Sequence, residues 1–284
     1  MRARTEAGAG RAPAAPWLRP RGSAARSPRV PRRLVPLLFA VPFLVIIVAW
    51  VLAKSVFGVS DAALPSVGDV IRASGQLINW GILPYDVSAS LYRIALGTAL
   101  AIVIGVPLGL LLGTSRYSVI MFGPFLRFFR AVSGIAILPL LIVWFGFTET
   151  TIQVAILYTA LIPIIFNTMT GVRMIPRGYA DAIETMGGGR ARLMRDVYLP
   201  GALASIVVGI RLGVGYGWRA LIAAEMLVGV GGLGSMIFGA LQFRALGQIV
   251  AGMILIGLLY LIVDRLILAP VEDATVRRWG VQRG

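Results

Sequence analysis

The sequence contains no cysteine and no histidine. The first absence excludes disulfides and thiol chemistry. The second excludes histidine-liganded metal sites, histidine general bases and Ser-His dyads. Charge is scarce as well, since 14% of the 284 residues are charged against about 25% in a typical soluble domain. The composition is therefore not that of a soluble enzyme.

Apolar residues make up 58% of the chain and occur in long blocks. Blocks of about 20 apolar residues are long enough to cross ~30 Å of hydrocarbon as helices. The pattern predicts an all-α, polytopic membrane protein with about six transmembrane helices. The expected spans cover about 34–53, 91–113, 131–148, 150–172, 202–228 and 247–268. A polar stretch at 65–86 has room for a short interfacial helix.

The net charge of +15 is unevenly distributed. Nine of the 27 basic residues lie in the first 33 positions, and most others lie in connections on one side of the predicted membrane. This is the positive-inside pattern, which argues against nucleic-acid binding and predicts that both termini face the cytoplasm. The cytoplasmic connections are then 114–130 and 173–200.

The first 33 residues are predicted to be a disordered, Arg-rich cytoplasmic arm. They are not expected to be a cleaved signal, because the apolar run after them exceeds the 7–15 residues of a signal core. The arm either contacts phosphates or lipid headgroups, or serves only as a solvated topological anchor. The membrane domain is expected at 34–270 and a cytoplasmic tail at 271–284.

Two rows of glycine recur at four-residue spacing in the second and fifth predicted spans. They are Gly105, Gly109 and Gly113, and Gly209, Gly213 and Gly217. Small residues at this spacing let helix backbones approach closely in lipid. The rows predict tight helix interfaces, either moving or static.

The fifth predicted span also carries charge. Arg211, Trp218 and Glu225 are seven residues apart and so share one helix face, which Arg219 flanks. Charges at membrane depth usually face the protein interior or a water-filled cavity. These four residues are therefore candidates for lining a translocation path. Alternatively, Arg211 and Glu225 lie near the span ends and extend to the interfaces.

The segment 178–200 interrupts the apolar spans with acidic and basic residues. Asp181 to Met186 and Ala191 to Tyr198 suit two short helices separated by the three glycines at 187–189, which permit a turn with positive φ. Leu199-Pro200 is expected to end the second helix. Because polar backbone cannot cross lipid, the segment is placed at the cytoplasmic face.

This segment resembles the signature of type I ABC importer permeases. The family pattern is E-A-A, a glycine four residues later, and I-x-L-P after nine more positions. The matching residues here are Asp181, Ala182, Ile183, Gly187, Val197, Leu199 and Pro200. Asp replaces Glu, and Ile replaces the second Ala. Stretches at 64–71, 137–146, 199–218 and 224–234 resemble the branch that handles nitrate, aliphatic sulfonates and taurine.

The resemblance covers about 34–280 and implies a permease of the MetI-like fold in a bacterial inner membrane. It implies a permease homodimer, contact with membrane lipid, an ABC ATPase that receives the segment 178–200 as a coupling helix, and an extracytoplasmic substrate-binding protein. The solute is expected to be a small anion. No cofactor is expected on this chain, which lacks a G-x-x-x-x-G-K-[ST] loop, so ATP and Mg would bind the ATPase.

Two other function classes are consistent with a polytopic helical protein. A membrane enzyme would use Asp181, Glu184 and Asp196 as an acidic cluster, but these flank a glycine break and lack supporting histidine or cysteine. A secondary transporter driven by an ion gradient would carry paired carboxylates at mid-membrane. Here Glu225 and Asp264 lie near span ends.

Overall fold

The computed structural model describes residues 35–56, 58, 60 and 63–278, and within these it is helical with no strand. The predicted arm at 1–33 lies outside the described residues. The chain divides into two compact units, 1–57 and 58–284, each considered by itself. The first unit contributes helix α1 (Val35–Ser55), which agrees with the first predicted span.

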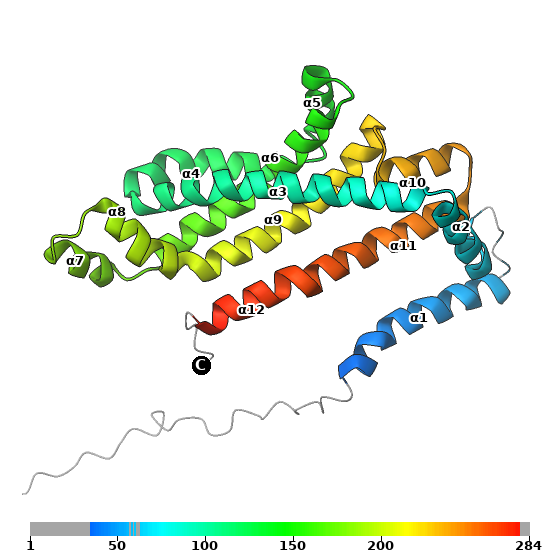
Figure 1. Cartoon of the computed structure of the whole chain (residues 1–284), viewed down its shortest axis with the longest axis horizontal. Coiled ribbons are helices and arrows are strands. Elements are labelled where there is room, and N and C mark those ends of the chain that lie inside the picture. Colours follow the sequence, from blue (N-terminus) through cyan, green and yellow to red (C-terminus); the bar gives the residue numbers. More distant parts are fainter. Residues whose placement is uncertain (1–34, 57, 59, 61–62, 279–284) are drawn as a thin grey trace, which may run out of the picture. The chain divides into compact units, whose positions relative to one another are not determined.

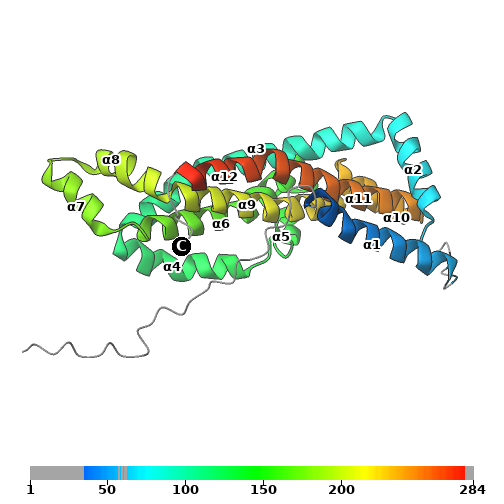
Figure 2. The ribbon, with the colours of Figure 1, turned by 90° about the horizontal axis from the view of Figure 1, so that it is seen from below.

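Three helices form the centre of the second unit. α3 (Ile82–Thr114) and α9 (Leu199–Val228) both pack along α6 (Glu149–Arg173), as Figures 1 and 2 show. Both glycine rows face α6: a Cβ added at Gly109 would lie 2.6 Å from Thr168 Cβ, and one at Gly213 would lie 3.0 Å from the Ala160 carbonyl oxygen. The small residues therefore let α6 lie against two neighbours at once.

Shorter helices surround this centre. α2 (Val67–Asn79) begins at a Ser66–Asp69 capping box and packs against α11 (Leu246–Val263), which confirms the expected short helix. α10 (Leu233–Gln242) packs between α9 and α11. Three further helices are α4 (Arg116–Ala131), α5 (Leu138–Phe145) and α12 (Ala269–Arg278), the last joined to α11 by the π-helical turn η3 (Asp264–Leu268).

Four helices in the described part are long and apolar enough to cross a membrane. They are Ile82–Thr114, Glu149–Arg173, Arg190–Val228 and Leu246–Thr275, and they match four predicted spans. The expected span at 131–148 is wrong. Its helix α5 has eight residues, about 12 Å at 1.5 Å per residue. A turn containing Gly134 precedes α5, and Pro139 lies in its first turn, where its missing N–H needs no partner.

Candidate functional site

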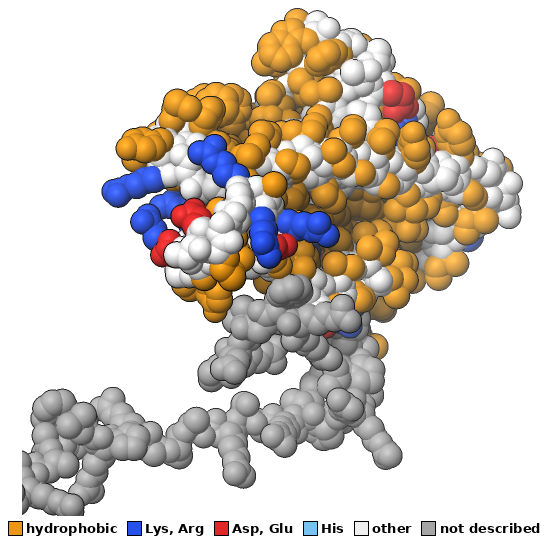
Figure 3. Space-filling model, turned by 60° about the vertical axis from the view of Figure 1, so that its left-hand side comes forward, with side chains coloured by type: hydrophobic (Ala, Val, Ile, Leu, Met, Phe, Trp, Pro, Cys, Tyr) orange, Lys and Arg blue, Asp and Glu red, His pale blue; other side chains and the backbone are white. Residues whose placement is uncertain are grey.

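The segment that resembles the coupling signature projects from one end of the second unit (Figures 1 and 2). It comprises α7 (Arg177–Thr185), a glycine turn, α8 (Arg190–Leu193) and the π-helical turn η2 (Met194–Tyr198). No residue of α7 is buried. Figure 3 shows Lys and Arg side chains gathered at this end, with Asp and Glu among them. Such an exposed helix is available to a partner.

The glycine turn ends α7 with a Schellman motif. Gly188 N–H donates to the Ile183 carbonyl and Gly187 N–H donates to the Glu184 carbonyl, both at 2.9 Å. Gly187 has a φ of +77°, a conformation in which other residues are strained. The predicted turn with positive φ is confirmed.

The expectation that Leu199-Pro200 ends the second helix is wrong. The helix runs without interruption from Arg190 to Val228. The π turn η2 widens the backbone just before Pro200, where Leu199 N–H donates to the Met194 carbonyl. This wider turn accommodates a proline that would otherwise clash with the preceding turn.

The residues of the coupling signature fall into two groups. Asp181 and Ala182 lie on exposed α7 and Gly187 lies in the turn. Val197 is buried, whereas Leu199 is 40% exposed, and Pro200 lies in the first turn of α9. Val197 thus anchors the segment to the rest of the unit, while α7 and the turn project outward.

Ile183 departs from the family pattern, and the structure shows what accommodates its larger side chain. A Cβ added at Gly188 would lie 2.4 Å from Ile183 Cγ2 and 2.9 Å from the Ile183 carbonyl oxygen. Gly188→Ala is therefore expected to lower the local stability of α7 by about 1–3 kcal/mol, the usual cost of overpacking. Amide hydrogen exchange over 177–189 measures this cost. Gly189→Ala is the control, since a Cβ there has no neighbour within 4 Å.

The double variant Ile183→Ala/Gly188→Ala separates packing from backbone strain. It removes the side-chain clash but keeps the approach to the Ile183 carbonyl oxygen, so part of the lost protection should return. If the double variant exchanges as fast as Gly188→Ala, the Ile183 side chain is not what Gly188 accommodates.

The four charged or aromatic path candidates occupy four different environments. Glu225 is fully buried and accepts hydrogen bonds from Ser90 Oγ at 2.8 and 3.0 Å, from Arg93 Nη1 at 2.7 Å and from Gly234 N–H at 2.9 Å. This network joins α3 to the start of α10. Glu225 therefore fixes the turn between α9 and α10 and does not face an open cavity.

Arg93 is the centre of the same network. Its guanidinium also pairs with Glu149 and donates to the Gly231 and Val230 carbonyls at 2.8 and 3.1 Å. The side chain of Arg93 is 5% exposed. No local sequence pattern identifies Arg93 as part of a network, because its partners Glu149 and Glu225 lie 56 and 132 positions away.

Trp218 and Arg211 line neither of the two cavities described below. Trp218 is buried, and its ring lies 5.8 Å from that of Tyr260. Arg211 pairs with Asp264 at 2.8 Å and with Glu272 at 2.5 Å, which ties α9 to η3 and α12. Two carboxylates neutralise Arg211. Its side chain therefore neither extends alone to the membrane interface nor presents a free positive charge.

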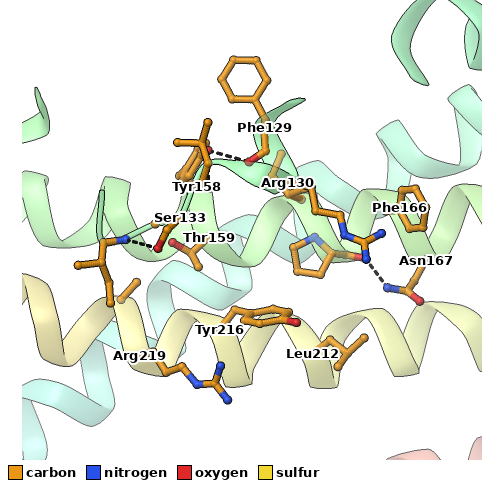
Figure 4. A pocket seen from close by; sticks show the side chains of 16 residues that line it. Phe129, Arg130, Ser133, Tyr158, Thr159, Phe166, Asn167, Leu212, Tyr216 and Arg219 are labelled. Atoms are coloured by element: carbon orange, nitrogen blue, oxygen red, sulfur yellow. Dashed lines mark hydrogen bonds between the residues drawn. The ribbon is translucent and has the colours of Figure 1, made fainter. Parts of the chain in front are cut away.

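Arg219 is the path candidate that lines a cavity. The cavity has a volume of about 510 Å³ and lies between α4, α6, α9 and the turn before α5. Figure 4 shows Tyr216 and Leu212 on α9 opposite Tyr158, Thr159, Phe166 and Asn167 on α6, with Phe129 and Arg130 from α4. Arg219 lines the edge of the cavity, with its guanidinium beyond Tyr216 and directed away from α6. We call it the Arg130–Arg219 cavity.

The Arg130–Arg219 cavity is cationic. None of its sixteen lining residues, all within the described part, carries a carboxylate. Arg130 lies over the Phe166 ring, with its Cζ 4.9 Å from the centroid, and Arg219 lies 5.6 Å from the Tyr216 centroid. These cation–π contacts hold the guanidinium groups without consuming their charge. Tyr158 donates its hydroxyl to the Phe129 carbonyl at 3.0 Å, which braces α4 against α6.

Most residues of this cavity were not predicted from the sequence. Arg130 lies in the predicted cytoplasmic connection 114–130, where the positive-inside pattern alone accounts for an arginine. The four-residue spacing of Thr159, Pro163 and Asn167 is a signal that could have identified the lining face of α6.

The chain is similar in sequence to known transport proteins. The family model described as "Binding-protein-dependent transport system inner membrane component" matches residues 101–269. The taurine transport system permease protein TauC of Escherichia coli (strain K12) is 34% identical over 178 residues, which is 62% of this chain and 64% of TauC. The alignment thus spans just under two thirds of that relative. The nitrate import permease protein NrtB of Synechocystis is 30% identical over 80% of this chain and 85% of its own.

Among solved structures, inward-facing MetNI methionine ABC transporter matches with a TM-score of 0.55. The match covers 70% of this chain and 96% of that chain at 23% identity. This likeness shows the fold, which is the expected MetI-like fold. The resemblance to the nitrate, sulfonate and taurine branch is likewise confirmed.

Proposed function

This chain belongs to the family of binding-protein-dependent transport system inner membrane components, and on that premise we propose that the Arg130–Arg219 cavity is part of a path for a small anion. As a family member, the chain is the permease subunit of an ABC importer and not an enzyme or an ion-coupled transporter. It works with an ATPase and a binding protein. The solute is the part of its function that the cavity addresses.

The observation that carries the proposal is the pair of arginines in a cavity whose lining has no carboxylate. Arg219 belongs to a helix that is long and apolar enough to cross a membrane, and charges at membrane depth are costly and mark substrate or ion pathways. Two cations without a counter-charge raise the local concentration of anions. The cavity volume of about 510 Å³ falls within the roughly 300–1,000 Å³ of small-molecule sites, so it holds a small solute together with water.

The names of two relatives support a solute that carries an anionic group such as a sulfonate. TauC is a taurine permease and NrtB is a nitrate permease by their names. We extend this chemistry, a compact group with negatively charged oxygens, to the solute of this chain. Guanidinium groups recognise such oxygens through paired N–H donors.

The proposal includes the assembly around the path. Two copies of the chain would pair in the membrane, with both termini in the cytoplasm, and the exposed α7 would dock into an ABC ATPase that binds ATP and Mg. The binding protein would deliver solute at the opposite end, near α2 and α10. The exposure of α7 and the absence of a P-loop in the sequence support this arrangement.

Arg219→Ala tests the proposed path. The variant complex, reconstituted with its ATPase and binding protein, is expected to take up the anion at least tenfold more slowly. Removing one charged partner of an ionic hydrogen bond typically costs about 1.5–3 kcal/mol, which is roughly ten- to hundredfold. Radiolabelled taurine and nitrate are suitable probes of uptake into proteoliposomes.

Two variants serve as controls for the uptake experiment. Arg219→Lys keeps the charge and should retain more uptake than Arg219→Ala. Arg127→Ala removes an exposed arginine of α4 that does not line the cavity and should leave uptake unchanged. Equal uptake by Arg219→Ala and wild type, with the complex intact, would show that Arg219 does not act on the path.

A further inference from the structure

A second cavity lies at the base of the coupling segment. It has a volume of about 380 Å³. Its walls come from the end of α3, the start of α4, the end of α6, the start of α7 and Tyr198 at the end of η2. It shares no lining residue with the Arg130–Arg219 cavity. We call it the basal cavity.

Three arginines from separate elements line the basal cavity. They are Arg116 at the start of α4, Arg173 at the end of α6 and Arg177 at the start of α7. None of them makes an ion pair with a residue that the structure describes, and no lining residue carries a carboxylate. By contrast, Arg192 nearby pairs with Asp196 at 3.4 Å. The positive-inside rule accounts for arginines at this end but not for three converging on one cavity without an acidic partner.

Hydroxyl groups complete the lining. Ser115 accepts a hydrogen bond from Ser118 N–H at 3.3 Å, so its own proton remains available for donation. The Tyr198 hydroxyl has no hydrogen-bond partner among the described residues. The basal cavity therefore offers guanidinium and hydroxyl donors, and its lining has no carboxylate that would bind a cation.

We propose that the basal cavity binds a phosphate group, supplied either by the headgroup of an anionic lipid or by free phosphate. Guanidinium groups match the geometry of phosphate oxygens through two parallel N–H···O bonds. The cavity lies where α3 and α6 end, two helices long and apolar enough to cross a membrane, and lipid headgroups border the ends of membrane spans. Basic pockets between such helix ends suit phospholipid headgroups.

A phosphate in this cavity would brace the coupling segment at both of its ends. Arg177 begins α7 and Tyr198 ends η2, directly before α9. Arg116 and Ser115 belong to the connection between α3 and α4. One ligand contacting these residues would connect α7 to the ends of two spans and limit its motion. The basal cavity is thus a candidate control point for α7, whichever solute is carried.

Lipid titration of the purified chain tests the site. Wild type in detergent is titrated with phosphatidylglycerol and with phosphatidylcholine, and bound lipid is counted by native mass spectrometry. Each arginine near a phosphate is expected to contribute about fivefold in affinity. Phosphatidylglycerol should therefore bind at least tenfold more tightly than phosphatidylcholine, and it should slow hydrogen exchange over 177–189.

The triple variant Arg116→Gln/Arg173→Gln/Arg177→Gln is expected to lose both effects. Because all three side chains are exposed, it should fold, and unchanged exchange in α6 verifies this. Arg127→Gln/Arg277→Gln/Arg278→Gln removes the same charge elsewhere on the predicted cytoplasmic side and should keep both effects. If the two triple variants bind phosphatidylglycerol equally, the proposal is overturned.

A second titration, with inorganic phosphate, distinguishes the two sources of the ligand. If inorganic phosphate protects 177–189 in wild type and wild type shows no preference for phosphatidylglycerol, the site takes free phosphate. If only phosphatidylglycerol protects, the source is lipid. If neither protects wild type, the basal cavity is not an anion site. None of these readouts involves transport, so they are independent of the solute path.

Discussion

Arg93→Ala is expected to lower the free energy of unfolding by about 3–5 kcal/mol, the usual cost of removing one partner of a buried ion pair. Glu225 is fully buried and would lose its only cationic partner among the described residues. Its carboxylate would remain in the protein interior, where an unpaired charge is poorly stabilised. The loss is measurable as a shift in the unfolding of the detergent-solubilised chain.

The expected loss is large because the network also holds the backbone of the turn before α10. Arg93 donates to the Gly231 carbonyl at 2.8 Å, and Asp86 accepts from Gly232 N–H at 2.9 Å. A Cβ added at Gly232 would lie 2.2 Å from Glu225 Oε1, so the carboxylate packs directly on this turn. Losing Arg93 therefore releases α10 as well as Glu225.

A surface pair provides the matched control for Arg93. Arg72 pairs with Asp69 at 2.7 Å but its side chain is 75% exposed. Arg72→Ala is expected to cost about 0–1 kcal/mol, as exposed pairs do. A double-mutant cycle with Arg93→Ala and Glu225→Ala then isolates their coupling. Similar losses for Arg93→Ala and Arg72→Ala would show that the buried network does not stabilise this fold.

Local patterns in the sequence were sufficient to predict the long spans and the glycine turn. Four apolar blocks form helices that contain the expected spans, because block length and apolar content decide membrane insertion. The turn at Gly187 follows from the chemistry of three consecutive glycines. Both features depend on neighbouring residues alone.

Features that join distant parts of the chain could not be predicted in this way. Arg93 and Glu225 lie 132 positions apart, and both glycine rows could have faced any helix before the structure placed them on α6. The Arg130–Arg219 cavity likewise needs three helices in one arrangement. The segment 131–148 is apolar as expected, but Gly134 lies in a turn and Pro139 lies in the first turn of a short helix, so the segment does not form one long span.

The continuation of α9 through Pro200 shows a different limit. Proline usually ends or kinks a helix, so Leu199-Pro200 predicted a break. The π turn at 194–198 removes the conflict, and no single-residue preference signals such a turn. The uninterrupted helix joins α8 to α9, which carries Arg219.

Gly187→Glu is expected to reduce ATP-driven uptake by at least tenfold while the complex stays assembled. Gly187 has a φ of +77°, which costs a non-glycine residue about 1–2 kcal/mol, or roughly five- to thirtyfold in the equilibrium constant between the native turn and its alternatives. A Cβ there has no neighbour within 4 Å, so the penalty comes from the backbone and not from a clash. The new carboxylate would also stand on the exposed surface proposed to meet the ATPase.

Two glycine-site variants separate the backbone from the charge. Gly189→Glu adds the same carboxylate two residues away, where φ is −80° and a side chain has open space, and it should retain more uptake. Gly187→Asn should also retain uptake, because asparagine tolerates positive φ. Uptake, ATP hydrolysis and co-purification of the ATPase are measured together. Hydrolysis that persists without uptake indicates lost coupling, whereas wild-type uptake by Gly187→Glu would mean that the turn does not transmit force from the ATPase.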